Sequence, residues 1–220
     1  MDNKQQQKKS LPYNNFEFKN PEEILIKTSR LLFDRFLTDS CGGNMSLRYE
    51  EKIYLTPRFS AEYFHWDIPA EKISIFDEEN NLVRGNLEEV SRESKLHLLI
   101  YKTFREISSV LHVHPPNIIA WFINHNVLIA ETQMMANRGS SRMRECNPEN
   151  PDQSEAQNND IIELFKKSLQ PEKPMSMAVA MKNHGAIVAS ENIFKAVSLL
   201  ESIEVNAKAM LFNEIFKKMQ

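Results

Sequence analysis

Cysteine, long apolar runs and an excess of positive charge are all scarce or missing in this sequence of 220 residues. Its two cysteines, Cys41 and Cys146, are too few for a disulfide framework, and we treat both as incidental. No apolar stretch approaches the roughly 18 residues of a membrane helix, and no apolar signal core lies near the N-terminus. We therefore expect a cytoplasmic protein that does not enter a membrane. The 27 basic and 30 acidic side chains form no basic stripe, which argues against a nucleic-acid partner and favours a small-molecule substrate.

The length and the 41% apolar content suit a single packed domain. Residues 1–15 are polar, so we expect a disordered tail followed by one domain over residues 16–220. The polar stretch 139–160 is either a lid or an insertion. Apolar spacing and capping residues predict helices at 21–37, 90–107, 117–124, 161–169 and 192–219. Short apolar runs between turn residues predict strands at 45–49, 53–56, 72–76, 82–84, 110–113, 177–181 and 186–189. This order predicts an α/β fold with α+β character: a three-layer α/β/α domain around a largely antiparallel sheet.

Two histidines at alternate positions, His112 and His114, end the apolar strand predicted at 110–113. Alternate residues of a strand point to the same face, with Cβ atoms roughly 6 to 7 Å apart, so both imidazoles can reach one metal ion. Pro115 and Pro116 stop the strand and place the pair at its end. The alternative is a half-buried strand whose histidines are satisfied by other hydrogen bonds.

A third histidine, His184, strengthens the metal hypothesis because it lies between two predicted strands and precedes Gly185, which allows close backbone approach. Three imidazoles are the minimum set for a catalytic zinc site with an open position. The other three histidines, His65, His97 and His125, have no partner at chelating spacing, and we expect them to be structural.

Four blocks of the sequence occur in an informative order and spacing. They are Gly43-Asn44-Met45-Ser46, Ser91-Arg92-Glu93 before His97-Leu98-Leu99-Ile100-Tyr101, His112-Val113-His114, and Asn183-His184-Gly185. With these blocks the chain resembles the class II aldolase/adducin family, which includes fuculose-phosphate and rhamnulose-phosphate aldolases. The resemblance extends from about Ile24 to Leu211.

This resemblance implies that His112, His114 and His184 bind Zn²⁺ or another divalent transition metal and that Glu93 is the catalytic acid/base. It also implies a role in carbohydrate metabolism and a homotetramer with active sites at subunit interfaces. In an aldol cleavage the metal would stabilise the enediolate on the ketone fragment, and a carboxylate such as Glu93 would move the proton on its carbon. Without the histidines, Glu93 would be interpreted as a solvated helix carboxylate.

The expected substrate-binding residues depart in part from the family pattern. They are Gly43, Asn44, Thr56, Arg58, Ser91 and Arg92. The sugar-phosphate aldolases carry Thr-Pro-Thr/Ser-Gly and Ser-Ser-Glu, where this chain has Thr56-Pro57-Arg58-Phe59 and Ser91-Arg92-Glu93. The family's phosphate site therefore does not carry over intact. The two arginines could hold a carboxylate or a differently placed phosphate, or they could be ordinary surface charges.

Three functions are compatible with the sequence. The first is a zinc-dependent aldolase or related lyase that acts on a small, anionic, hydroxylated carbonyl compound. The second keeps the metal for a dehydratase, epimerase or decarboxylase reaction; an epimerase would be expected to have aspartate in place of Glu93. The third is a non-catalytic protein like the adducin head, which the retention of the three histidines and Glu93 disfavours.

Overall fold

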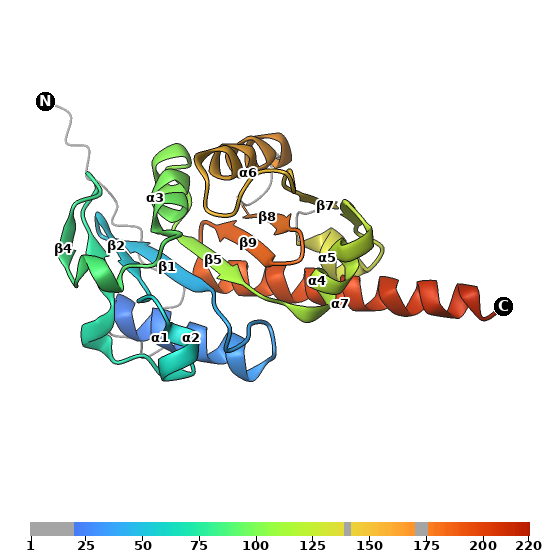
Figure 1. The fold of residues 1–220 in the computed structure, drawn as a ribbon, viewed down its shortest axis with the longest axis horizontal. Coiled ribbons are helices and arrows are strands. Elements are labelled where there is room, and N and C mark those ends of the chain that lie inside the picture. The colour runs from blue at the N-terminus through green and yellow to red at the C-terminus, as the bar shows by residue number, and fades with distance from the viewer. Residues whose placement is uncertain (1–19, 139–141, 170–175) are drawn as a thin grey trace, which may run out of the picture.

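The computed structural model describes residues 20–138, 142–169 and 176–220, whose strands form one nine-stranded sheet (Figure 1). In chain order the strands are β1 (Asn44–Tyr49), β2 (Lys52–Leu55), β3 (Ser74–Phe76), β4 (Leu82–Arg84), β5 (Ser109–Val113), β6 (Val127–Ile129), β7 (Arg142–Glu145), β8 (Ser176–Met181) and β9 (Gly185–Ser190). Their spatial order is β4-β3-β2-β1-β5-β9-β8-β7-β6. Among these described strands only β7 and β8 pair in parallel, so the expectation of a largely antiparallel sheet is confirmed.

Helices cover both faces of the sheet. They are α1 (Pro21–Asp34), α2 (Ser60–Phe64), α3 (Ser94–Thr103), α4 (Pro116–Asn124), α5 (Gln133–Asn137), α6 (Glu155–Ser168) and α7 (Ile193–Lys218). One hydrophobic core contains residues of α1, α2, α4, α5 and α7, and the other contains residues of α3 and α6 (Figure 1). Alternate residues of β9 enter the two cores, with Val188 in the first and Ile187 in the second. This explains why β9 has an uninterrupted apolar sequence and confirms the three-layer fold.

Helix α1 begins where the sequence predicted and ends earlier. The side chain of Asn20 accepts a hydrogen bond from the Glu23 backbone N–H at 2.6 Å, which caps the first turn. The helix ends at Asp34 instead of residue 37 because Phe36 takes a left-handed conformation with φ of 57°. Leu37 then donates its N–H back to the last turn in a Schellman arrangement.

Helix α3 is shorter than the predicted range 90–107, so both predicted ends were wrong. Residues Leu87–Glu89 form a 3₁₀ turn, and Val90 forms an isolated antiparallel bridge with Pro57. This bridge holds the chain extended before Ser94, where the helix begins. Glu93 is consequently the residue that precedes the helix, outside its regular face.

Strands β6 and β7 and helices α2 and α5 were not predicted. The stretch 139–160 includes β7 and the start of α6, so this part of it belongs to the folded body. In β7 the buried Met143 lies between the exposed Arg142 and Arg144, and one apolar residue gives no periodic signal. Residues 1–15, for which a disordered tail was predicted, lie outside the described residues. None of the described helices is long and apolar enough to cross a membrane.

The sheet topology brings distant parts of the chain together at one end of the central strands β1, β5 and β9. Strand β5 lies between β1 and β9 and is antiparallel to both, so the end of β5 meets the beginnings of the other two. Asn44 pairs with His112, and Val113 pairs with Ala186. The histidine pair of β5 and the histidine before β9 therefore lie side by side.

Candidate functional site

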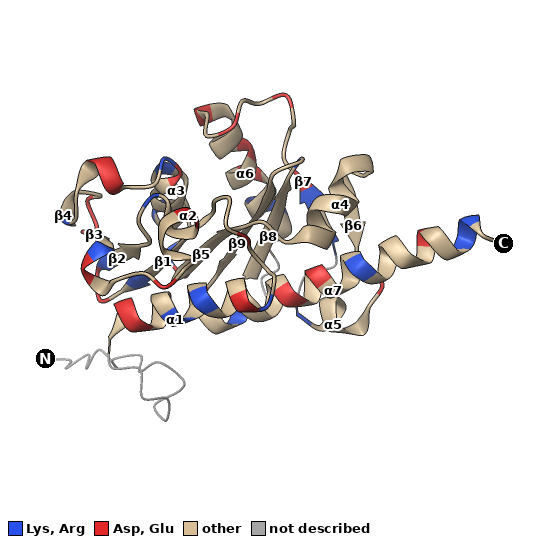
Figure 2. Cartoon of the chain, turned by 60° about the horizontal axis from the view of Figure 1, so that its bottom comes forward, with Lys and Arg blue, Asp and Glu red and all other residues tan. Residues whose placement is uncertain are grey.

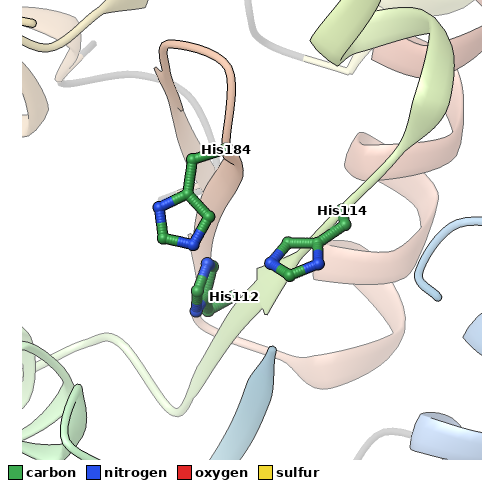
Figure 3. A group of neighbouring side chains, drawn as sticks. All are labelled: His112, His114 and His184. Atoms are coloured by element: carbon green, nitrogen blue, oxygen red, sulfur yellow. The ribbon is translucent and has the colours of Figure 1, made fainter. Parts of the chain in front are cut away.

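His112, His114 and His184 form a compact cluster in which the potential ligand atoms all lie within 4.8 Å of one another. Figure 3 shows the two rings at the end of β5 and the ring from the β8–β9 turn directed toward a common point. The ring centroids are 5.2 Å apart for His112 and His114, and 4.9 and 5.3 Å from each of these to His184. This spacing suits three nitrogen ligands at about 2.0 Å from one ion.

Two glycines make this close approach possible. A Cβ atom on Gly185 would lie 2.3 Å from the Val113 carbonyl oxygen and 2.9 Å from Cδ2 of His114. A Cβ atom on Gly42 would lie 3.0 Å from Cε1 of His114. The ring of His114 is thus packed against backbone on two sides, which larger residues would not allow.

Each imidazole has a carboxylate near its Nδ1 atom. Glu93 Oε2 lies 2.5 Å from Nδ1 of His112, and Asp39 Oδ1 lies 3.0 Å from Nδ1 of His114. The Asp152 carboxylate is farther away, 3.6 Å from Nδ1 of His184. Within the described ranges, the buried Nε2 atoms of His112 and His114 have no hydrogen-bond partner. Buried polar atoms without partners are costly, and a bound metal ion would satisfy these two.

Burial and hydrogen bonding shift the pKa values of side chains at the site. Burial lowers the pKa of His114 and of His184, and the nearby His112 lowers both further. Burial alone would raise the pKa of Glu93, but hydrogen bonds from His112 and Asn44 and the charge of His112 outweigh it and hold that pKa at about 2. Neutral imidazoles beside a carboxylate are the protonation states that a divalent metal site requires. The donor set fits Zn²⁺ or a similar transition metal.

Beside the histidines lies a cavity of about 150 Å³ that most of the predicted site residues line. Asn44 donates a side-chain hydrogen bond to Glu93 and so links the start of β1 to the carboxylate. Thr56, predicted to bind substrate, does not line the cavity; it is buried, and its hydroxyl accepts a hydrogen bond from the Met45 N–H at 3.0 Å. The predicted residues that do line the cavity are Gly43, Asn44, Arg58, Ser91, Arg92, Glu93, His112, His114 and His184.

The two arginines of the cavity wall lie on loops that are joined to each other. The backbone N–H of Arg58 donates a hydrogen bond to the backbone carbonyl oxygen of Glu89 at 2.6 Å, beside the bridge between Pro57 and Val90. The guanidinium of Arg58 lies 4.4 Å from the centroid of the Phe59 ring. Neither Arg58 nor Arg92 forms an ion pair with a carboxylate in the described part of the chain. Their charges remain available to an anion.

Sequence reasoning missed several residues at the site. Asp39 contacts His114, and Cys41 and Gln153 line the cavity. The sequence contained a signal for Asp39. It lies shortly before Gly42, in the loop that leads into the predicted strand 45–49, and that loop also carries the predicted site residues Gly43 and Asn44. Gln153 had none, since it comes from the polar stretch before α6.

Two of the remaining histidines, His97 and His125, have structural partners. His97 is fully buried, and its Nδ1 lies 2.6 Å from the Ser46 hydroxyl, which also contacts the Tyr101 hydroxyl at 2.8 Å. His125 stacks on Trp121 with ring centroids 3.8 Å apart. Neither side chain lines the cavity.

Comparison with known proteins gives a consistent result along the chain. The profile of the Class II Aldolase and Adducin N-terminal domain family matches residues 23–211. An L-fuculose phosphate aldolase of Methanocaldococcus jannaschii is 28% identical over 193 residues, which cover 88% of this chain and 97% of that protein. A 3-oxo-tetronate 4-phosphate decarboxylase of Haemophilus influenzae is 24% identical over 205 residues, 85% of either chain. The solved structure of l-fuculose-1-phosphate aldolase from Thermus thermophilus superposes with a TM-score of 0.74 at 16% identity, covering 90% of this chain and 96% of that one.

Proposed function

The chain belongs to the class II aldolase and adducin N-terminal domain family, and from this premise we propose that it is a metal-dependent aldolase. The proposed reaction cleaves a carbon–carbon bond in a small, anionic, hydroxylated carbonyl compound such as a sugar phosphate. The observation that carries the proposal is the cluster of three histidines, one buried and two partly buried, beside an ionised glutamate.

We assign metal binding to His112, His114 and His184. When bound there, Zn²⁺ or a similar ion supplies a Lewis acid that stabilises negative charge on the carbonyl oxygen of the substrate, worth several kcal/mol. The chain's own contribution is to hold three imidazoles at the end of β5 and the start of β9. The lowered pKa values of His114 and His184 favour metal binding at neutral pH over protonation.

We assign the acid/base role to Glu93. A pKa of about 2 leaves its carboxylate ionised and able to accept a proton at neutral pH, although only as a weak base. Efficient proton transfer needs a pKa closer to the working pH. The hydrogen bonds from His112 and Asn44, which hold the pKa low, must therefore be exchanged in part for contacts with substrate. The proton it moves is the one on the carbon next to the carbonyl.

Substrate binding is assigned to the cavity wall formed by Gly43, Asn44, Ser91 and the two arginines. Arg58 and Arg92 have no carboxylate partner among the described residues, which supports a role in holding the anionic group of the substrate. Thr56 acts indirectly in this proposal, because its hydroxyl fixes the backbone of β1 at Met45.

A second candidate reaction is decarboxylation of an oxo acid at the same site. Loss of carbon dioxide leaves the same kind of charge on the carbonyl oxygen as aldol cleavage does. Two guanidiniums facing the cavity suit a substrate with more than one anionic group, and the relative from Haemophilus influenzae is named for such a reaction. Products distinguish the two reactions, since only the aldolase releases an aldehyde.

The homotetramer stays a prediction. It is supported by apolar side chains that remain exposed along the last turns of α7, where Phe212, Ile215 and Phe216 are 49%, 53% and 61% exposed. Figure 1 shows this part of α7 extending beyond the sheet. The molar mass of the protein in solution tests the assembly.

The function is tested with Glu93→Gln and His114→Ala. The wild type should bind about one zinc ion per chain and exchange a proton on dihydroxyacetone or its phosphate with solvent. Glu93→Gln should keep the metal and lose the exchange, because the amide cannot accept the proton. His114→Ala should lose both the metal and the exchange.

Two matched variants serve as controls for these measurements. Glu163→Gln changes an exposed carboxylate paired with Lys166 on α6, and His65→Asn changes an exposed histidine. Both should keep the metal and the exchange rate. Proton exchange that persists in Glu93→Gln would remove Glu93 as the base, and a wild type without bound metal would reject the metal site.

A further inference from the structure

Asp39 contacts the histidine cluster from outside the cavity. Its Oδ1 atom lies 3.0 Å from Nδ1 of His114, and Asp39 is not among the residues that line the cavity. We propose that Asp39 is a positioning residue that fixes the tautomer and the orientation of His114 for metal binding. This inference rests on the proposed metal site.

The carboxylate of Asp39 is itself held in place. Its Oδ1 accepts the backbone N–H of Cys41 at 2.9 Å, and its main-chain carbonyl oxygen accepts the indole N–H of Trp66 at 2.8 Å. Trp66 is fully buried in the hydrophobic core that also contains residues of α1 and α2. The loop that carries Asp39 is therefore anchored at both its side chain and its backbone, and the carboxylate can act as a fixed acceptor.

The ring of His114 is positioned by contacts in two different directions. Gly42 and Gly185 pack against carbon atoms of the ring, Cε1 and Cδ2, and restrict how far it can tilt. These glycines do not decide which nitrogen carries the proton. Asp39 does so, because a carboxylate only accepts hydrogen bonds and therefore favours the proton on Nδ1.

With the proton on Nδ1, the lone pair of His114 lies on Nε2. This atom is buried and has no hydrogen-bond partner in the described structure. The arrangement of carboxylate, imidazole and open nitrogen is the one in which an outer carboxylate orients a metal ligand and raises its basicity. The side chain of His114 is 9% exposed, so water competes little for its Nδ1 proton.

The other two histidines are supported differently. His112 has Glu93 on its Nδ1, but Glu93 lines the cavity and is assigned to proton transfer. The carboxylate near Nδ1 of His184 is that of Asp152, which lies 3.6 Å away and is 63% exposed. Asp39 thus gives His114 the support of a carboxylate that has no part in the chemistry.

The test compares Asp39→Ala and Asp39→Asn with an Asp34→Ala control. Asp34 is an exposed carboxylate paired with Arg30 on α1, away from the cavity. The measured quantity is the zinc dissociation constant of the full chain, obtained by competition with a chromophoric chelator. Asp39→Ala should bind zinc about 10 to 100 times more weakly. Asp39→Asn keeps an oxygen that can accept the Nδ1 proton and should recover part of the affinity, and Asp34→Ala should match the wild type.

A second measurement reads the tautomer directly in metal-free protein. Nitrogen chemical shifts of His114 should show the proton on Nδ1 in the wild type and in Asp39→Asn, and a mixture of tautomers in Asp39→Ala. If Asp39→Ala fails to fold, the wild-type spectrum remains decisive against the inference, because a His114 protonated on Nε2 would overturn it. A role of Asp39 only in loop structure would lower the unfolding temperature of the metal-free variant without changing the tautomer.

Two results would overturn the inference alone: an Asp39→Ala variant with wild-type zinc affinity, or a wild-type His114 protonated on Nε2. A wild type that binds no zinc would instead reject the proposed metal site, and this inference with it. The two failures are therefore distinguishable.

Discussion

The two sides of the cavity are built in different ways. On the histidine side, the proposed ligands lie at the ends of buried strands. Gly42 and Gly185 pack so closely against this region that a Cβ atom on either one would crowd His114 or the Val113 backbone. On the arginine side, Arg58 and Arg92 lie on loops, and their guanidiniums are free of carboxylate partners in the described residues. Backbone packing therefore fixes the positions of the histidine rings, whereas the positions of the two guanidiniums depend on the conformations of their own side chains.

We infer that the two sides have different roles: the histidine side binds the metal for the reaction, and the arginine side recognises the substrate. A metal cluster tolerates little displacement, because its nitrogens must all reach one ion, and strand ends within a packed sheet provide that precision. Side chains on loops can change without disturbing the sheet. Charges of both signs are interspersed along α1 and α7 in Figure 2, and the positive charge on the cavity wall comes from the two loops that carry Arg58 and Arg92.

The largest effect is expected from Gly185→Ala, which breaks the packed side. The new Cβ would lie 2.3 Å from the Val113 carbonyl oxygen, and the strand must shift to relieve the overlap. Overpacking of this kind costs about 3 kcal/mol of unfolding free energy. The shift also moves His184 away from His114, so zinc binding should be lost. Denaturant unfolding and metal content measure the two consequences.

Gly85→Ala is the matched control for this prediction. Gly85 has φ of +115° and a Cβ there would lie 2.9 Å from the Ser74 hydroxyl, but it is remote from the histidines, between β4 and the 3₁₀ turn at Leu87–Glu89. Gly85→Ala should therefore lose stability and keep zinc. Normal zinc binding in Gly185→Ala would show that the close approach of β5 and β9 is not what forms the cluster.

A somewhat smaller effect, dependent on pH, is expected from His97, which is fully buried and contacts Ser46 of β1 behind the cavity wall. Burial is the main cause that lowers its pKa from 6.5 to about 3. Between these values the unfolded chain binds a proton that the folded protein does not, so stability is complete above pH 6.5 and falls as the pH decreases. His97 should therefore lower the free energy of unfolding by about 2 kcal/mol as the pH falls from 6.5 to 5.

Unfolding of metal-free wild type and of His97→Gln across this pH range measures the contribution. The variant lacks the titrating group, so its stability should fall less steeply, by up to about 1.4 kcal/mol per pH unit. Equal slopes would mean that the pKa of His97 is the same in the folded and the unfolded protein. Contributions that the two proteins share cancel in the difference.

The sequence was sufficient to predict that the three histidines lie together, and insufficient to predict the carboxylate that contacts His114. His112 and His114 could be placed together because a strand turns alternate residues to one face, and the antiparallel pairing of β5 with β9 then brings His184 beside them. Asp39 was missed because its contact with His114 spans a loop whose path depends on the buried Trp66. No local periodicity encodes such a contact.

The fold shows the same contrast. Apolar strands such as β8 and β9 were predicted within a residue or two of their bounds, since both of their faces enter hydrophobic cores. Strand β7 was missed because its exposed arginines give no apolar pattern, and it forms only by pairing with β6 and β8. The predicted helix at 90–107 began too early because the bridge between Pro57 and Val90 is a tertiary contact.

The smallest effect is expected on the loop side, from Arg58→Ala and Arg92→Ala. Loss of one hydrogen-bonded charge to the anionic group of the substrate should lower kcat/KM about 10-fold, which corresponds to about 1.4 kcal/mol, and should appear mainly as a higher KM. Turnover of an uncharged ketose should change little, because it makes no such contact. The ratio of kcat/KM for phosphorylated, carboxylated and uncharged substrates measures the effect. Arg105→Ala, which removes an exposed guanidinium outside this cavity, should leave the ratio unchanged. If both variants on the cavity wall also keep the wild-type ratio, the two arginines are surface charges, and substrate recognition must come from the backbone and small side chains around Gly43 and Ser91.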